Sequence, residues 1–204
     1  MKNILSILKK LPIDLGQANL RSKTEGKQIA LRLVPMAKGK RALDIGCREG
    51  EQAELLKKRG YIVEAIDIEL KYAHAKKIDV NVGLPYANEY FDLVWCSEVL
   101  EHLKEPEYSV SEMKRVLKKN GMLILTTPNS NFWLFRLLKL FGIKPCKLQN
   151  PTHIHFFSIL DIKRILPEAN IFGYFPYFII KKTIRSLPAI NLLSPTFVVK
   201  VYKE

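Results

Sequence analysis

Short apolar runs alternate with amphipathic segments along most of this 204-residue chain. Apolar residues at helical spacing predict helices over residues 17–37, 51–59, 70–77, 106–119 and 158–166. Apolar runs predict strands that begin at 41 and cover 61–67, 78–80, 91–96, 122–127, 174–181 and 196–202. The run at 122–127 is apolar throughout, as in a strand that is buried on both faces. The alternation predicts an α/β fold in which helices cover both faces of a doubly wound sheet.

The most informative segment is Arg41–Gly50, in which a buried strand ends at a glycine-containing turn and a helix begins at Glu51. Such a turn presents backbone N–H groups at the amino end of a helix, where a polar or anionic ligand is held closely. Asp67 ends the next apolar run, where a carboxylate can accept hydrogen bonds from ribose hydroxyls. The segment predicts half of a nucleotide-cofactor site, with Gly46 and Gly50 at places where a side chain would obstruct the cofactor. A purely conformational role for the two glycines is the alternative.

The glycine spacing distinguishes among nucleotide cofactors. A dinucleotide site would show G-x-G-x-x-G. This turn instead reads Asp44-x-Gly46-x-x-x-Gly50, and it lacks the Lys-Ser/Thr pair of a phosphate-binding loop. The pattern resembles motif I, D-x-G-x-G-x-G, of the class I S-adenosylmethionine-dependent methyltransferases. Arg48 departs from that motif, because the family usually has glycine at this position.

Further segments resemble the same family in the same order, and the resemblance covers about residues 40–167. They are Asp79–Tyr86, Glu89–Asp92, Leu93–His102, Leu117–Asn129 and His153–Ser158. The last is similar to the H-x-x-F-F-S/T segment of the ubiquinone-type and related small-molecule methyltransferases. The resemblance implies a Rossmann-like, doubly wound, seven-stranded sheet that is mostly parallel with an antiparallel C-terminal strand. It also implies S-adenosylmethionine as the cofactor.

The expected cofactor site is built from the turn and from the ends of the following strands. Its predicted residues are Asp44, Gly46, Cys47, Gly50, Asp67, Ile68, Asp79, Val80 and Ser97. Asp44 would orient the turn or, through water, the ammonium group of the cofactor, and Asp67 would bind the ribose. The resemblance places Asp79 on the adenine amino group and the N–H of Val80 on a ring nitrogen. Ser97 would line the methionine end, with a helix N-cap as the alternative.

Two groups of residues are candidates for chemistry on the acceptor side. Glu98, Glu101 and His102 have the i, i+3, i+4 spacing that places three side chains on one face of a helix. They resemble the E-x-x-E-H segment of ubiquinone-type O-methyltransferases and could hold a divalent cation. We favour a structural hydrogen-bond cluster over a metal site. His153 and His155 would point the same way on a strand, and the resemblance points to His153 as the general base for a hydroxyl acceptor. A packed, structural histidine is the alternative for each.

The net charge of +13 is concentrated in two flanking segments. Residues 1–40 carry +7 and residues 131–204 carry +8, whereas residues 41–130 carry −2. The basic flanks favour an acidic partner, such as nucleic acid, an anionic lipid or a phosphorylated substrate. A solvated lysine-rich surface is the alternative. Three cysteines without metal-ligand spacing favour a reduced, cytoplasmic setting, and the first ten residues have too short an apolar core for a signal peptide.

The length suits a single domain over residues 1–204. Its predicted parts are an N-terminal helical lead-in at 1–40, a cofactor-binding core at 41–130, an apolar and basic insert at 131–157, and a C-terminal helix with strands at 158–204. Within the insert, residues 132–141 are apolar except for Arg136 and Lys139, and they are too few to span a bilayer. We favour a lid over the acceptor pocket, followed by a peripheral membrane contact. A dimer contact is the third alternative.

These observations predict an enzyme that transfers a methyl group from S-adenosylmethionine to a small-molecule or lipid-like acceptor, with a hydroxyl as the candidate group. The basic flanks suggest RNA methylation as an alternative. Against it, the N/D-P-P-[YF] motif of amine methylation does not follow the fourth strand, where Cys96–Glu98 stands. A cofactor-binding protein without turnover is a further alternative, because Arg48 replaces a glycine of the turn.

Overall fold

The computed structural model describes residues 24–140, 142, 152–176 and 182–204. Several predictions lie outside these residues. One is the prediction that the first ten residues are not a signal peptide. The others concern Cys146, the first part of the helix at 17–37 (residues before Thr24), and most of the strand predicted at 174–181.

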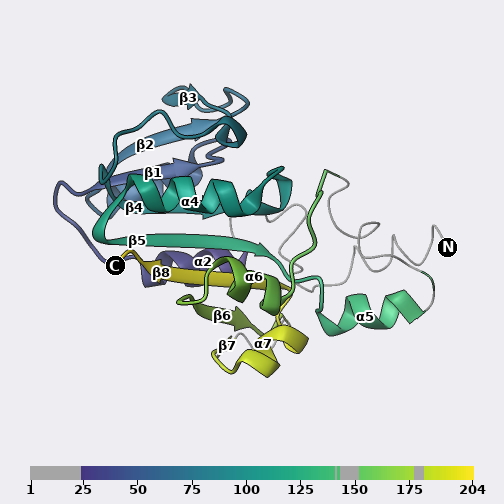
Figure 1. The fold of residues 1–204 in the computed structure, drawn as a ribbon. Helices are drawn as coiled ribbons and strands as arrows, with labels where there is room; N and C mark the ends of the chain where they lie inside the picture. The colour runs from purple at the N-terminus through teal and green to yellow at the C-terminus, as the bar shows by residue number, and fades with distance from the viewer. Residues whose placement is uncertain (1–23, 141, 143–151, 177–181) are drawn as a thin grey trace.

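The centre of the molecule is an eight-stranded sheet with the order β3-β2-β1-β4-β5-β8-β6-β7 (Figure 1). The strands are β1 (Arg41–Ile45), β2 (Ile62–Asp67), β3 (Ala75–Lys77), β4 (Phe91–Ser97), β5 (Leu117–Pro128), β6 (Asn170–Tyr174), β7 (Thr183–Ile184) and β8 (Thr196–Tyr202). The first five strands are parallel, β8 is antiparallel to β5, and β6 is antiparallel to β8. The Rossmann-like, mostly parallel sheet with an antiparallel C-terminal strand is therefore confirmed, and β7 adds an eighth strand.

Helices cover both faces of the sheet because its central strands are apolar on both sides. The helices of the described residues are α2 (Glu25–Leu33), α3 (Glu51–Lys58), α4 (Pro106–Val116), α5 (Trp133–Leu140), α6 (Ile159–Ile165) and α7 (Leu187–Leu193), with short 3-10 helices η1 (Val80–Val82) and η2 (Leu100–His102). Successive strand residues turn to opposite faces. Leu43 and Val94 join the core under α4 and α6, whereas Ala42 and Leu93 join the core under α2 and α3. Figure 1 shows α4 in front of the sheet and α2 behind it.

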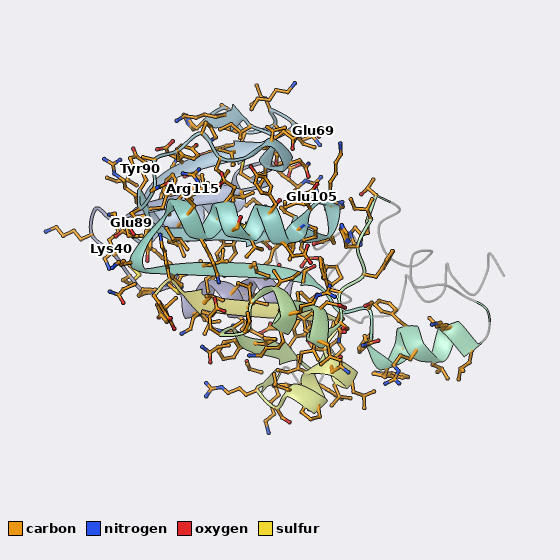
Figure 2. All side chains as sticks on the ribbon, viewed as in Figure 1. Lys40, Glu69, Glu89, Tyr90, Glu105 and Arg115 are labelled. Atoms are coloured by element: carbon orange, nitrogen blue, oxygen red, sulfur yellow. The ribbon has the colours of Figure 1, made fainter. Side chains whose placement is uncertain are left out.

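The parallel strands bring different loops to the two ends of the sheet. Lys40, just before β1, and Glu89 and Tyr90, just before β4, lie at the amino ends of the strands, on the left in Figure 2. Glu105, which follows β4 by way of η2, lies toward the opposite end. The glycine turn after β1 and the loop after β4 thus share the carboxyl end of the sheet, where open α/β sheets bind their ligands.

The region between β2 and β4 differs from the prediction. The helix expected at 70–77 is absent, and the short strand β3 pairs there with β2. The strand expected at 78–80 is replaced by the 3-10 turn η1, which Asp79 caps by accepting a hydrogen bond from the N–H of Asn81. β3 is a three-residue edge strand with exposed Lys76 and Lys77, so it has no apolar run by which a strand is recognised.

Two other element boundaries were predicted wrongly. The helix expected to end at Asn120-Gly121 stops at Val116, because the buried Leu117 already pairs with Phe91 as the first residue of β5. Asn120, with φ of 59°, instead lies in an irregular stretch where the β4–β5 register shifts. β6 ends at Tyr174, where the predicted strand was to begin, and its Gly173 packs closely against Ser194.

The predicted insert contains α5, an eight-residue helix that begins five residues after the end of β5. In Figure 1 this helix stands beside the body of the sheet rather than on one of its faces. None of the helices in the described part of the chain is long and apolar enough to cross a membrane.

Asn129 ties the end of β5 to α7. Its buried side-chain amide donates to the carbonyl oxygens of Ile190, Asn191 and Ser194, at 3.3, 2.9 and 2.7 Å. Its backbone N–H donates to the Pro195 carbonyl oxygen at 2.8 Å. One amide therefore contacts three carbonyl groups at the carboxyl end of α7, of which that of Ile190 also accepts the N–H of Ser194 at 3.1 Å.

We predict that Asn129→Ala lowers the free energy of unfolding by about 2–4 kcal/mol, because buried carbonyl groups lose their donor. Denaturant unfolding followed by circular dichroism measures the change. Asn88→Ala, at an exposed position, is the control and should change stability by less than about 0.5 kcal/mol. Equal effects of the two substitutions would contradict the proposed role of Asn129.

Candidate active site

The glycine turn between β1 and α3 depends on left-handed backbone conformations. Gly46 has φ of 72° and Gly50 has φ of 82°. A Cβ atom at Gly46 would lie 2.2 Å from Val99 Cγ2, and one at Gly50 would lie 2.3 Å from Tyr72 Cδ2. Backbone conformation and packing are therefore enough to explain why glycine occupies both positions. Their contact with a cofactor remains a prediction.

The carboxylate of Asp67 connects this turn to the end of β2. Its Oδ2 accepts a hydrogen bond from the N–H of Arg48 at 2.9 Å, and its Oδ1 accepts one from the N–H of Glu69 at 2.9 Å. Arg48 takes the left-handed conformation usual for glycine, with φ of 46°, and its side chain lies on the surface beside Glu49. Arg48 therefore replaces the usual glycine of motif I without disrupting the turn.

Asp44 lies beneath the turn, at the end of β1, and is completely buried. Burial raises its pKa to about 7, although the positive charge of Lys27 opposes the rise. Among the described residues, its Oδ2 has no hydrogen-bond partner. A buried acceptor of this kind is suited to a donor supplied by a ligand.

Lys27 is a candidate functional residue that the sequence analysis missed. It lies on α2, one turn before the buried Ala30. Burial lowers the pKa of its ammonium group, and the carboxylates of Glu98 and Asp44 oppose that shift. The signal in the sequence is weak, because a single lysine on a helix is usually solvated.

Hydroxyl and carboxylate groups meet at the carboxyl ends of β4 and β5. Ser97 Oγ shares a hydrogen bond with Thr126 Oγ1 at 2.8 Å, and Thr126 Oγ1 also lies 2.8 Å from Glu98 Oε1. Thr127 Oγ1 donates to Glu101 Oε2 at 3.0 Å. Ser97 is thus buried in this network and does not cap a helix.

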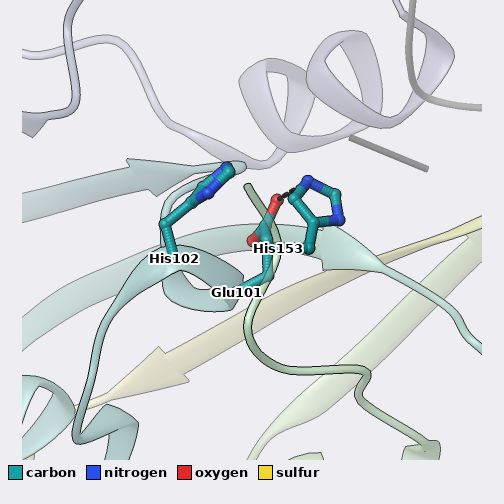
Figure 3. A group of neighbouring side chains, drawn as sticks. All are labelled: Glu101, His102 and His153. Atoms are coloured by element: carbon teal, nitrogen blue, oxygen red, sulfur yellow. Dashed lines mark ion pairs between the residues drawn. The ribbon is translucent and has the colours of Figure 1, made fainter. Parts of the chain in front are cut away.

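Glu101, His102 and His153 form a compact cluster in this region (Figure 3). Glu101 Oε1 lies 3.7 Å from His153 Nε2, and the rings of His102 and His153 meet edge to face with centroids 4.7 Å apart. Burial, followed by the charge of Glu98, raises the pKa of Glu101 well above its usual range. Ile154 and His155 both donate their backbone N–H groups to the Glu101 carbonyl oxygen, which fixes the loop that carries His153.

This arrangement corrects two predictions about side-chain direction. Glu98 has φ of 56° and η2 contains only three residues, so Glu98, Glu101 and His102 do not share one helical face. His153 joins Glu101, whereas His155 lies 3.3 Å from the Lys104 carbonyl oxygen and stacks on Phe157. The two histidines therefore have different surroundings.

Glu101, His102 and His153 could together hold a divalent cation, whereas the set expected from the sequence included Glu98 in place of His153. One ligand atom from each of Glu101, His102 and His153 lies within 4.8 Å of the others. Glu98 is not a member of this group.

The remaining predicted cofactor residues lie around the turn and the end of β2. Cys47 is buried with Ala53 and Ala65, and burial raises the pKa of its thiol to about 12; its contact with the cofactor remains a prediction. Val80 is buried and Asp79 is exposed at η1. Ile68 is 61% exposed and presents an apolar surface just beyond Asp67.

Known proteins resemble this chain in sequence. A family model described as a methyltransferase domain matches residues 20–171. The ubiquinone biosynthesis O-methyltransferase of Coxiella burnetii is 32% identical over 108 residues, which cover 47% of this chain and 46% of the relative. The protein of the same name from Klebsiella pneumoniae is 26% identical over 152 residues, which cover 67% of this chain and 60% of the relative. The chain thus spans about half the length of the curated relatives it matches.

Solved structures resemble this chain in fold. A SAM dependent methyltransferase from Archaeoglobus fulgidus superposes with a TM-score of 0.64 at 21% identity, covering 90% of this chain and 97% of that one. An S-adenosylmethionine dependent methyltransferase from Mesorhizobium loti gives a TM-score of 0.67 at 15% identity, covering 89% and 99%. With the family match over most of its length, the chain belongs to the class I S-adenosylmethionine-dependent methyltransferases.

Proposed function

We propose that this protein transfers a methyl group from S-adenosylmethionine to a hydroxyl group of a small-molecule or lipid-like acceptor, with His153 as the general base. The observation that carries the proposal is the buried pair of Glu101 and His153 at the carboxyl ends of β4 and β5. The likeness to ubiquinone biosynthesis O-methyltransferases supports a hydroxyl acceptor.

The residues around the glycine turn fit the cofactor. Asp67 would accept hydrogen bonds from the ribose hydroxyls, in addition to those from the two backbone N–H groups that it already receives. The unpartnered Oδ2 of Asp44 would accept from the ammonium group, directly or through water. The partly buried Lys27 would stand as a counter-ion to the carboxylate of the methionine moiety. When bound, the cofactor supplies a methyl group that its sulfonium sulfur already activates.

The acceptor side lies next to this turn. Val99, which immediately precedes η2, packs directly on Gly46. Glu101 is two residues further along the chain, so it lies close to the glycine turn. Burial of His153 and Glu101 keeps water from the reacting groups. A site of this kind would align two substrates, which is the main requirement of an in-line methyl transfer.

His153 would take the proton of the acceptor hydroxyl as the new bond to the methyl carbon forms. Glu101 acts through His153 as a positioning residue, because its Oε1 faces the imidazole Nε2. An ionised Glu101 would also stabilise the imidazolium that forms. The bond between Thr127 and the other oxygen of Glu101 holds that carboxyl group in place.

The first prediction of the proposed function concerns Asp67. Asp67→Ala should weaken the binding of S-adenosylhomocysteine by about 1.5–3 kcal/mol, because a charge-assisted acceptor for two hydroxyls is lost. Calorimetric titration gives the dissociation constant. Glu69→Ala removes a neighbouring exposed carboxylate and should leave affinity within about twofold. An unchanged constant for Asp67→Ala would remove Asp67 from the cofactor site.

The second prediction uses the raised pKa of Asp44. With a pKa of about 7, this carboxyl group is mostly protonated at pH 6 and mostly ionised at pH 7.5. An ammonium-bearing ligand prefers the ionised form, so affinity for S-adenosylhomocysteine should rise up to about eightfold over that range. Asp44→Asn should bind more weakly and lose the pH dependence. A pH profile that Asp44→Asn retains would show that another group controls it.

A third prediction concerns the base. His153→Ala should lower turnover by about 10²–10⁴-fold while it leaves the affinity for S-adenosylhomocysteine nearly unchanged. His155→Ala, in the same loop but facing Lys104, is the matched control and should keep most of the activity. The measurement is methyl transfer to a panel of hydroxyl-bearing acceptors, together with the melting temperature of each variant.

Two outcomes would contradict this role of His153. Full activity of His153→Ala would make the histidine structural. Loss of wild-type activity on chelation, with recovery on adding magnesium, would instead assign Glu101, His102 and His153 to a cation.

A further inference from the structure

Helix α5 presents an exposed apolar stripe on the side that faces solvent. Leu134, Phe135 and Leu138 are buried on one side of the helix. On the other side, Leu137 is 42% exposed and Leu140 is 81% exposed. Leu137 and Leu140 lie one turn apart, so their side chains are neighbours on the helix surface. A surface helix ordinarily has polar residues on that side.

The charged residues of α5 itself all have one sign. Arg136 and Lys139 are exposed next to Leu137 and Leu140, and α5 contains no acidic residue. From Asn131 to Leu160 the sequence has four lysine or arginine residues and no aspartate or glutamate. A helix that combines exposed leucines with cations and has no acidic residue is complementary to an apolar layer beneath anionic groups.

We infer that α5 docks on an anionic lipid surface, with Leu137 and Leu140 inserted below the headgroups and Arg136 and Lys139 at the level of the lipid phosphates. Eight residues of helix are about 12 Å long, which suits a helix lying in the interface. The long side chains of arginine and lysine allow their charges to stay in the headgroup layer while the leucines enter it.

The position of α5 gives this contact a role beyond attachment. Trp133 begins the helix six residues after Thr127, which binds Glu101 in the candidate active site. A docked α5 would therefore turn the carboxyl end of β5 toward the bilayer. If the acceptor is lipid-like, as in the proposed function, it would enter the site from the membrane surface. The docking itself does not depend on that function.

The buried residues of the insert are unsuitable for testing this contact. Phe132 and Phe135 are 0% and 2% exposed, so a charge at either position would disturb packing before it reached a membrane. Leu137 and Leu140 can be changed without burying the new side chain.

Co-sedimentation with vesicles provides the test, using the full chain. Wild-type protein should sediment with vesicles that contain phosphatidylglycerol and only weakly with pure phosphatidylcholine vesicles. Leu137→Glu/Leu140→Glu should reduce binding to the anionic vesicles by at least about tenfold. Arg136→Glu/Lys139→Glu should remove the preference for anionic lipid. Ile62→Glu is the matched control, since Ile62 is 60% exposed and begins β2 at the opposite end of the sheet.

The inference would be overturned by two results. Wild-type protein could fail to sediment with anionic vesicles, or Leu137→Glu/Leu140→Glu could bind them as well as Ile62→Glu does. A change of oligomeric state in Leu137→Glu/Leu140→Glu, without vesicle binding by the wild type, would assign this face to a second copy of the chain. Melting temperatures equal to that of the wild type show that each variant is folded.

Discussion

The two-sided burial of β1, β4 and β5 is the constraint on which the rest of the structure depends. Their side chains face an apolar layer on each side of the sheet, so a charged group in the middle of these strands would lose its hydration without gaining a partner. Polar chemistry is therefore confined to the strand ends. Asp44 is the penultimate residue of β1, Glu98 directly follows β4, and Glu101 lies in η2 just beyond it.

This confinement also explains the perturbed charges of the candidate site. Asp44 and Glu101 have raised pKa values and Lys27 has a lowered one, in each case chiefly because of burial. Each group is thus held in an environment that disfavours its ionised form. A ligand that carries both an ammonium and a carboxylate group would supply the missing partners. Part of the binding energy would then come from pairing charges that folding has already removed from water.

The sequence predicted those features whose physical cause is local. The glycine turn between a strand and a helix and the carboxylate at the end of β2 were predicted because these residues lie within one continuous segment, whereas the conformational role of Gly46 and Gly50 was only the alternative. The helix assumed for Glu98, Glu101 and His102 failed because Glu98 adopts a left-handed conformation, which residue spacing does not reveal. Lys27 was missed because its charged neighbours Asp44 and Glu98 are distant in the chain and are brought near it only by the fold. The edge strand β3 was missed because exposed lysines give it no apolar signal.

Glu101 contributes its backbone as well as its side chain to the candidate site. Its carbonyl oxygen is a shared acceptor for the N–H groups of Ile154 and His155, while its carboxyl group faces His153. The loop and η2 are consequently joined through Glu101 by two kinds of contact, and His102 adds contacts to Thr152 and His153. Displacing the loop would break both together, so the loop should move between discrete positions rather than drift through a continuum. Hydrogen exchange at the amides of Ile154 and His155 would then follow the cooperative opening of η2, and would report on the integrity of the acceptor side even in the absence of any substrate.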